Sequence, residues 1–347
     1  MIRRPDFSAP SADPAPNPPQ AAAGRTRLVG GRVSPVPGEP AFTLDVPGDV
    51  PGELPLPVLI AVPHAGRAYP AELVARMRAS ELCQLRLEDR HVDHLGAAVA
   101  EATGAALLTA HAPRAMLDLN RADSDIDWEM IEGPRLSSLV SGSASGSRAG
   151  QGGGIAANHR ARSGLGLIPR RMPGYGEIWR SRLPRAELDR RIAEVHQPYH
   201  AALERQLQHI RSIWGAALLI DLHSMPPLPQ RESGSPVPVM VVGDRFGAAC
   251  HHALASRALG FFAGEGVEAA HNRPYSGGYV LDRHGDPSNG IHAMQIEVCR
   301  SLYLDDDFAE LTSGASAIAA LLTQLVMALG RETAALGQAR TLLQAAE

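Results

Sequence analysis

Two strand-like runs in this chain each end in a histidine, and a third run carries a glutamate. Residues 58–62 lead through a proline into His64, residues 216–222 lead into His223, and residues 294–298 hold Glu297 among apolar neighbours. Short apolar runs of β-type residues are typical of buried strands in an α/β sheet. Such sheets place their ligands at the carboxyl ends of the strands. The pattern therefore predicts imidazoles and carboxylates at one sheet edge, which are the usual protein groups of a hydrolytic zinc site.

Strands and helices alternate along the chain, and no internal repeat is evident. Residues 26–57 have the character of a leading strand or hairpin. Further strands are predicted at 107–110, 115–119 and 237–242, and helices are predicted after Pro70 and over 84–102, 185–213, 246–259 and 308–330. Such alternation predicts a three-layer α/β/α sandwich in a single domain covering residues 26–347. We expect residues 1–25, which are rich in Pro and Ala, to be disordered, and the Gly/Ser-rich residues 137–154 to form a flexible loop.

Composition narrows the possible classes of function. A net charge of −4 and a pI near 6.4 argue against a general nucleic-acid-binding protein. The N-terminal segment has no apolar stretch, so neither a signal peptide nor a membrane span is expected there. Cys83, Cys250 and Cys299 are odd in number and share no CxxC spacing, so we expect no disulfide framework and a cytoplasmic location. The sequence carries no signal for an oligomeric state.

The two strand-end histidines are the leading candidates for metal ligands. Hydrolytic zinc usually takes three protein ligands, commonly two His and one carboxylate, and leaves a fourth position for water. His64 and His223 would supply the two imidazoles. The identity of the carboxylate ligand stays open among Glu88, Asp89 and Asp93, which all lie on the predicted helix over 84–102. Residues 89 and 93 are four apart and would share one face of that helix. Asp93 is a candidate either for a ligand or for a group that orients one.

Glu297 is the candidate general base. The two-residue period of a strand puts it on the face opposite Met294, Ile296 and Val298. A carboxylate inside a strand is costly unless it is paired or used in chemistry. Close to a metal-activated water, Glu297 would take up a proton and later pass it to the leaving nitrogen. A buried ion pair is the other interpretation of this residue.

Several polar and cationic residues are candidates for binding the substrate. Asn120 and Arg121 follow the predicted strand at 115–119, and Arg114 lies just before it. Arg283 and His284 follow a Gly-Gly turn. A guanidinium binds a carboxylate in a two-pronged fork. Several cations around one site would suit a dicarboxylate, although ordinary surface ion pairs remain an alternative for each arginine.

Eight segments of the chain together resemble a known family. They are PHAGRAYP (63–70), EDRHVDHL (88–95), PRAMLDLNR (113–121), GLIPRR (166–171), YHAALERQL (199–207), IDLHSM (220–225), NRPYSGGYVLDRHGDP (272–287) and GIHAMQIEVCRSLYLDD (290–306). Their order and spacing are similar to those of the N-formylglutamate amidohydrolase family over about residues 40–330. That family in turn resembles the zinc carboxypeptidases and the aspartoacylase and succinylglutamate desuccinylase enzymes. The resemblance implies a mixed central sheet and a fold like that of the zinc carboxypeptidases.

The resemblance also implies roles for individual residues. His64 and His223 would ligate zinc or another divalent transition metal. Asn120 and Arg121 would hold the substrate carboxylate or polarise its carbonyl, and Glu297 would be the base. The wider group usually has its carboxylate ligand three residues after the first histidine, where this chain has Arg67.

A third ligand must therefore come from elsewhere in this chain. The family's aspartate-bearing segment aligns best on Asp89, with Glu88 as the alternate. Position 90 is Arg90 rather than an aromatic residue, which indicates a divergent branch and bears on the identity of the substrate more than on the chemistry.

The expected function is zinc-dependent hydrolysis of a small N-acyl amino acid. N-formyl-L-glutamate is the best candidate, giving formate and L-glutamate in the last step of one route of histidine degradation. One alternative is a related zinc hydrolase that acts on another N-acyl amino acid or a short peptide. The other is a metal-binding protein on the same scaffold without turnover, which the intact set of His64, His223, Glu297 and Arg121 argues against.

Overall fold

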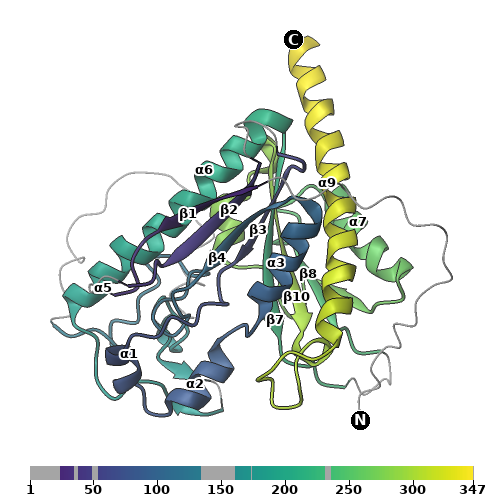
Figure 1. Ribbon diagram of the computed structural model, residues 1–347. Helices are drawn as coiled ribbons and strands as arrows, with labels where there is room; N and C mark the ends of the chain where they lie inside the picture. Colours follow the sequence, from purple (N-terminus) through teal and green to yellow (C-terminus); the bar gives the residue numbers. More distant parts are fainter. Residues whose placement is uncertain are drawn as a thin grey trace.

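The fold centres on one mixed sheet of eight strands (Figure 1). The computed structural model describes residues 24–34, 38–48, 54–133, 161–172, 174–230 and 236–346. In spatial order the strands are β1 (Arg25–Gly30), β2 (Phe42–Pro47), β4 (Ala106–Ala110), β3 (Val58–Val62), β7 (Ala217–Met225), β10 (Ile291–Cys299), β8 (Met240–Gly243) and β9 (Ala269–His271). Strands β4, β3, β7 and β10 are mutually parallel, whereas β2 and β8 run antiparallel to their inner neighbours. This confirms the α/β prediction.

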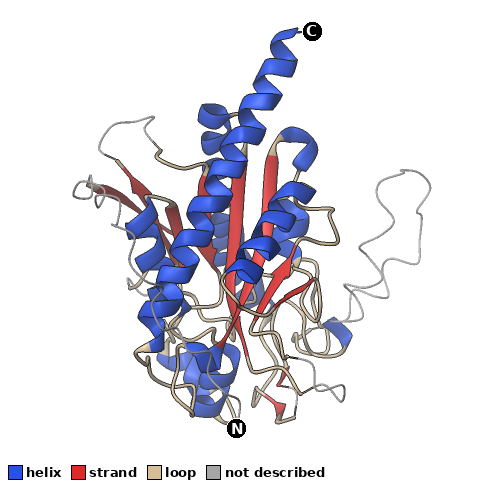
Figure 2. Ribbon diagram, turned by 90° about the vertical axis from the view of Figure 1, so that its right-hand side faces the viewer, coloured by secondary structure: helices blue, strands red, loops and turns tan. Residues whose placement is uncertain are grey.

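Helices cover both faces of the sheet (Figures 1 and 2). One face carries α5 (Arg185–Arg191), the π turn η2 (Ile192–His196) and α6 (Gln197–Trp214), and the other carries α3 (Val92–Thr103), α7 (His252–Gly264) and α9 (Gly314–Ala346). Side chains along β3 point alternately to the two helical layers. Leu59 and Ala61 pack with α6, while Ile60 and Val62 pack with α3 and α9. Both faces of β3 are therefore apolar and buried, as is typical of a strand covered by helices on both sides.

Shorter elements lie at the carboxyl ends of the parallel strands. They are α1 (Ala71–Ala75), α2 (Ser80–Leu87), the two-stranded β5 (Arg171–Met172) and β6 (Gly176–Glu177), α8 (Tyr279–His284), and the 3-10 turns η3 (Pro287–Asn289) and η4 (Arg300–Leu302). The expected hairpin is formed by β1 and β2, and the helix expected after Pro70 is α1.

The helix predicted over 84–102 is wrong, because the chain leaves the helical conformation in its middle. Helix α2 ends at Leu87, and α3 begins at Val92. Glu88 is extended, and His91 has a left-handed backbone with φ of 60°. Tertiary bonds replace the helical ones, since the Asp89 amide donates to the His64 carbonyl at 2.9 Å. Local helix propensity gives way here to contacts that hold Asp89 against the sheet.

The strand predicted at 115–119 is also wrong. These residues form an irregular segment whose amides bond locally and to Leu167, for example Asp118 N to the Leu167 carbonyl at 2.8 Å. The apolar side chains that gave the run its strand-like pattern are buried in the core, which explains the composition without a ladder. Smaller differences are that His223 lies inside β7 rather than after it, that α7 begins at His252, and that α9 begins at Gly314 and continues to Ala346.

The long amphipathic helix predicted over 185–213 is present, with a π turn inside it. Pro198 has no N–H and cannot donate to the carbonyl of Glu194. That carbonyl instead accepts the backbone N–H of Arg32 at 2.9 Å, from the segment after β1. The Gln197 amide reaches back five residues to the Ile192 carbonyl, which is the bond of a π turn.

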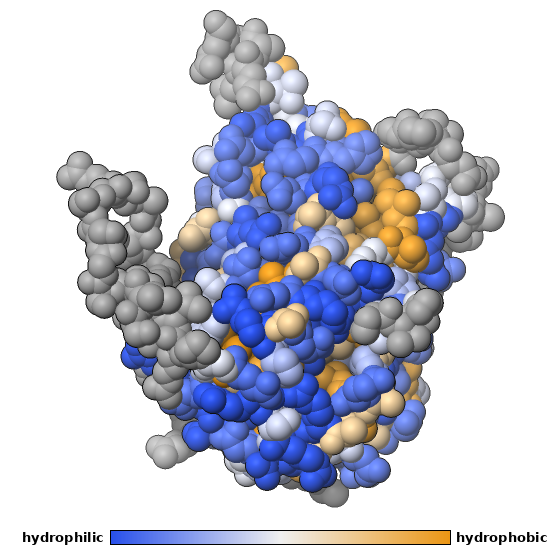
Figure 3. Space-filling model, turned by 90° about the vertical axis from the view of Figure 1, so that its left-hand side faces the viewer, coloured by the Kyte–Doolittle hydropathy of each residue, from blue (hydrophilic) through white to orange (hydrophobic). Residues whose placement is uncertain are grey.

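Figure 3, which views the molecule from the left of Figure 1, shows a mostly hydrophilic surface on that side.

Helix α9 is long and apolar enough, by length and composition alone, to cross a membrane. Its apolar side chains Ile318, Leu322 and Leu325 are instead buried against the sheet and α3, so packing accounts for them. The three cysteines are free, in line with the expected lack of a disulfide framework, and all three are buried. Residues 1–23 and the expected loop at 137–154 lie outside the described residues, and Arg25 already belongs to β1.

Candidate active site

Three neighbouring parallel strands bring the predicted chemistry to one place. His64 lies two residues beyond the end of β3, His223 lies near the end of β7, and Glu297 lies in β10 directly beside His223 in the strand register. Ala61 of β3 pairs with Asp221 of β7, so the carboxyl ends of all three strands meet at one edge. The sequence argument about strand ends is confirmed in this respect.

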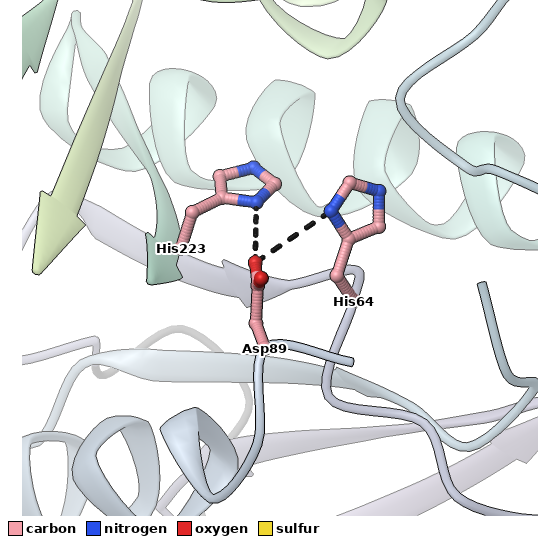
Figure 4. A group of neighbouring side chains, drawn as sticks. All are labelled: His64, Asp89 and His223. Carbon is pink, nitrogen blue, oxygen red and sulfur yellow. Dashed lines mark hydrogen bonds and ion pairs between the residues drawn. The ribbon is translucent and has the colours of Figure 1, made fainter. Parts of the chain in front are cut away.

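His64, Asp89 and His223 form one buried cluster (Figure 4). The Asp89 Oδ2 lies 2.9 Å from Nδ1 of His223 and 3.6 Å from Nδ1 of His64. One potential ligand atom from each residue falls within 4.8 Å of the other two, and all three side chains are buried. Two imidazoles and a carboxylate in this arrangement are the donor set that zinc and similar ions prefer.

Each imidazole is held from behind by a further carboxylate. The Nε2 of His64 lies 2.8 Å from Asp118 Oδ1, and the Nε2 of His223 lies 2.9 Å from Asp221 Oδ2. A carboxylate acceptor places the proton on Nε2 and leaves each Nδ1 facing Asp89, which is the usual support of a metal-binding histidine. These residues therefore fit a divalent metal.

The supporting carboxylates were missed in the sequence. Asp221 had a signal, because it precedes His223 by two residues in a strand and so shares its face. Asp118 had none, since it contacts His64 across 54 residues of chain. Arg300 was missed as well, although it fixes the other oxygen of Asp89, Oδ1, at 3.1 Å.

Neighbouring groups of opposite charge shift the pKa values of the carboxylates and of His223 in this cluster. Burial would raise the pKa of Asp89, but the neighbouring His223 and His64 hold it well below its usual range. Burial likewise opposes ionisation of Asp118, yet Arg114 and His64 keep its pKa well below normal. Burial would lower the pKa of His223, but Asp221 and Asp89 hold it well above its ordinary value. Asp89 and Asp118 are thus kept ionised although they are buried.

The other two carboxylates considered for the third ligand point elsewhere. Glu88 is buried, and its Oε2 bonds Nη1 of Arg90 at 3.2 Å. Asp93 is held in a two-pronged pair by Arg67, with the shorter contact at 2.7 Å. Because Glu88 is extended, its side chain and that of Asp89 point to opposite sides of the chain. The structure brings Asp89 to the histidines and leaves Glu88 and Asp93 out.

Glu297 faces the cluster from the neighbouring strand. Its Oε1 accepts a hydrogen bond from Nε2 of Gln295 at 2.8 Å, two residues earlier on the same face. Burial raises the pKa of Glu297 to about 7, with His223 lowering it and Asp89 raising it. A carboxyl group that titrates near neutral pH beside a potential metal site is suited to exchange protons with water.

A cavity of about 390 Å³ opens over these groups. Asn120 and Arg121 line it, and so do Tyr275 and the turn at residues 277 and 278. Its wall contains five arginines, namely Arg86, Arg114, Arg121, Arg171 and Arg300. The Nε of Arg114 bonds Asp118 Oδ2 at 3.0 Å, and its charge also acts on Asp89 and Glu297. So many guanidinium groups around a small cavity favour an anionic ligand.

Two of the expected substrate-binding residues are not at the cavity wall. Arg283 and His284 lie on α8, just beyond the Gly-Gly turn that does line it. Arg283 donates to the Tyr279 hydroxyl at 2.7 Å, and His284 stacks on His200 with ring centroids 5.3 Å apart. The short helix turns both side chains away after the turn has reached the cavity.

Comparisons with known proteins show which family the chain resembles. The family model for N-formylglutamate amidohydrolase matches residues 56–304. An N-formylglutamate deformylase of Pseudomonas aeruginosa is 29% identical over 80% of this chain and 95% of its own length. One of Pseudomonas putida is also 29% identical, over 72% of this chain and 83% of its own.

Solved structures give the same result. The crystal structure of an N-formylglutamate amidohydrolase from Ralstonia eutropha superposes with a TM-score of 0.69 at 30% identity, covering 84% of this chain and 98% of that one. A gene product of Agrobacterium tumefaciens, at 17% identity and a TM-score of 0.57, shares the fold. The family match covers most of the chain and includes every residue of the buried cluster, so this chain belongs to the N-formylglutamate amidohydrolase family and is an amidohydrolase.

Proposed function

We propose that this enzyme hydrolyses N-formyl-L-glutamate to formate and L-glutamate, with zinc or another divalent transition metal in its site. The observation that carries the proposal is the meeting of His64, Asp89 and His223 with Glu297 in one arginine-lined cavity. The relatives named N-formylglutamate deformylase support this substrate. A substrate with two carboxylates also suits the five arginines.

His64, Asp89 and His223 would hold the metal, His64 and His223 through Nδ1. When bound there, a zinc-class ion would polarise the formyl carbonyl and make water a stronger acid. Asp118 and Asp221 would keep the rings in place, and Arg300 would keep Asp89 turned toward them. The likeness of the fold to the zinc carboxypeptidases belongs to the same proposal.

Glu297 would move the proton. It accepts one from the attacking water, whose oxygen bonds to the formyl carbon. It then delivers that proton to the amide nitrogen as the C–N bond breaks, so that formate and the free amine of glutamate leave. A pKa near 7 lets the same group act in both directions at neutral pH.

The arginines would bind and neutralise charge. Arg114 acts electrostatically on Asp89 and Glu297, so together with Arg121 it would stabilise the negative oxygen that forms on the carbonyl. Asn120 and Arg121 would hold a substrate carboxylate. Arg283 and His284 would have no direct contact with substrate.

The wider setting is also part of the proposal. Apart from the small β5–β6 pair, all the strands between Arg25 and Cys299 belong to one sheet. This supports a single domain over residues 26–347. A cytoplasmic enzyme of histidine degradation, acting on a small molecule without nucleic acid or membrane, is the setting we propose. A related hydrolase for another N-acyl amino acid or a short peptide is the alternative, and the arginine-lined cavity favours an acidic one.

One experiment tests metal and substrate together. Metal content would be measured on the purified full chain, and formate release would be followed with N-formyl-L-glutamate, N-formyl-L-glutamine and N-acetyl-L-glutamate. We expect about one zinc-class ion per chain and the fastest turnover with N-formyl-L-glutamate. His64→Ala should lose metal and activity together, whereas the control His209→Ala, an exposed histidine on α6 that belongs to no group of potential metal ligands among the described residues, should keep both. Full activity without metal, or no formate release from any of the three, would overturn the proposal.

A further inference from the structure

The segment that carries Asn120 and Arg121 has no strand or helix to hold it. Buried peptide groups must find hydrogen-bond partners somewhere. Here the carbonyls on either side of Asn120, those of Leu119 and Arg121, are bonded by side chains of η2 and α6. His200 Nε2 lies 3.1 Å from the Leu119 carbonyl, and His196 Nε2 lies 2.9 Å from the Arg121 carbonyl.

These histidines form a directed chain with a third one. A carbonyl only accepts, so both Nε2 atoms carry the proton. The Nδ1 of His200 must then accept, and it lies 3.0 Å from Nε2 of His284. The order of donation is therefore His284 to His200 to the Leu119 carbonyl. All three rings are buried, and burial lowers the pKa of each, that of His284 to about 3, which keeps them neutral.

The fold provides for this arrangement at two points. The π turn ends at His196, and the helix that follows carries His200 one turn later, with the two rings 4.3 Å apart. On the other side, the Val280 amide of α8 donates to Asn120 Oδ1 at 3.0 Å. A Cβ at Gly278 would lie 2.5 Å from that same oxygen, so a glycine is required for this approach. π turns of this kind are frequent at functional sites.

We propose that His196, His200 and His284 are positioning residues that hold Asn120 and Arg121 at the cavity wall. They touch neither the cavity nor the metal cluster and act through the backbone of the segment between them. The proposal rests on the proposed function in one respect, namely that Asn120 and Arg121 contact the substrate. It explains why three neutral imidazoles are buried beside an active site in which they have no chemical part.

The test compares variants that keep or lose the donated hydrogen bond. His196→Leu and His200→Leu remove the N–H donor, and His196→Gln and His200→Gln retain an amide N–H that reaches the same carbonyl. His292→Leu is the matched control. His292 is also buried, but it lies in β10 on the face away from Glu297, and its ring is near that of His251 at the start of α7. Thermal melts and metal content would be recorded for every variant.

Two readouts separate positioning from mere stability. The first is KM and kcat for N-formyl-L-glutamate, together with inhibition by L-glutamate. The Leu variants should raise KM and the inhibition constant about tenfold or more, with a smaller effect on kcat, and the Gln variants should stay within about threefold of wild type. The second is hydrogen exchange of a peptide covering residues 117–123, which should be accelerated about tenfold or more in the Leu variants alone.

Each outcome decides something. Unchanged exchange and unchanged KM in the Leu variants would overturn the proposal while leaving the proposed function intact. If wild type releases no formate, the proposed function fails, and the exchange data still decide whether the histidines hold the segment. If the Leu variants do not fold, His284→Leu replaces them, since it removes only the far end of the chain. It should accelerate exchange in residues 117–123, and unchanged exchange there would refute the directed chain.

Discussion

Replacing Glu297 by Gln should make the metal-free protein more stable at alkaline pH and should lower the kcat of the metal-loaded enzyme. Glu297 is buried beside His223 and has a pKa of about 7, compared with an ordinary value of 4.5. The folded state therefore holds this proton more tightly than the unfolded state does. The stabilisation is fully present below pH 4.5 and is lost as the pH rises through about 7. Gln mimics the protonated form at every pH and keeps the acceptor for Gln295.

The size of the effect follows from the shift. A rise from 4.5 to about 7 corresponds to up to about 3 kcal/mol, at about 1.4 kcal/mol for each tenfold change in proton affinity. The difference in unfolding free energy between E297Q and wild type should be near zero at pH 4.5. It should grow to about 3 kcal/mol in favour of E297Q at pH 8. Adding zinc should shrink this difference, because a nearby cation favours the ionised carboxylate.

Urea unfolding of chelator-treated protein between pH 4.5 and 8 measures this difference directly. Glu204→Gln, which changes an exposed carboxylate on α6, is the matched control and should show no such trend. In the metal-loaded enzyme kcat should fall by about 100-fold or more, or about 2.7 kcal/mol, with metal retained. An E297Q protein that is less stable than wild type at pH 8, or that keeps near-normal kcat, would refute the reasoning. Loss of metal from E297Q would instead make Glu297 a ligand.

Three further predictions follow from the same site and core. Asp221→Asn should weaken metal binding by about 10- to 100-fold, because it removes the anionic partner of His223; competition with a chelating dye measures this, and unchanged affinity would contradict the role of Asp221. Arg121→Lys keeps the charge but loses the planar fork, so kcat/KM for N-formyl-L-glutamate should fall about tenfold or more, or about 1.4 kcal/mol; near-normal kinetics would place Arg121 outside substrate contact. The contribution of His292 to stability should decrease as the pH falls from about 6.5 to about 4, because burial lowers the pKa of His292 to about 4 and the unfolded chain takes up the proton first. In urea unfolding, the stability of His292→Leu relative to wild type should therefore rise over this range, and a constant difference would argue against it.

The sequence predicted the parts of the site that depend on regular strands. His64, His223 and Glu297 were found because parallel strands of one sheet place their carboxyl ends together, and this rule needs no knowledge of the loops. Asp89 came only from the family resemblance. On the residues alone it was one of three acidic candidates on a single predicted helix.

The remaining features depend on contacts between distant residues. The break at residues 88–91 occurs because Asp89 and Glu88 bond His64 and Arg300 through their backbone, and no local pattern encodes those partners. The segment at 113–121 has strand-like composition because its apolar side chains are buried. Its peptide groups are satisfied by imidazoles from α6 and η2 rather than by a neighbouring strand. A period of two or 3.6 residues identifies elements, but it does not reveal this kind of tertiary hydrogen bond.

The order of strands in the sheet also has a consequence for how the enzyme forms during synthesis. Strand β10 comes after β8 in the chain but lies between β7 and β8, so it must enter between two segments made earlier. A nascent chain that stops before Ile291 already contains His64, Asp89 and His223, but it lacks Glu297 and has an open edge on β7. Such long-range pairing is slow and leaves strand edges exposed until it is complete. Entry of β10 both completes the centre of the sheet and brings in Glu297, so the proposed proton carrier is in place only once the sheet is complete.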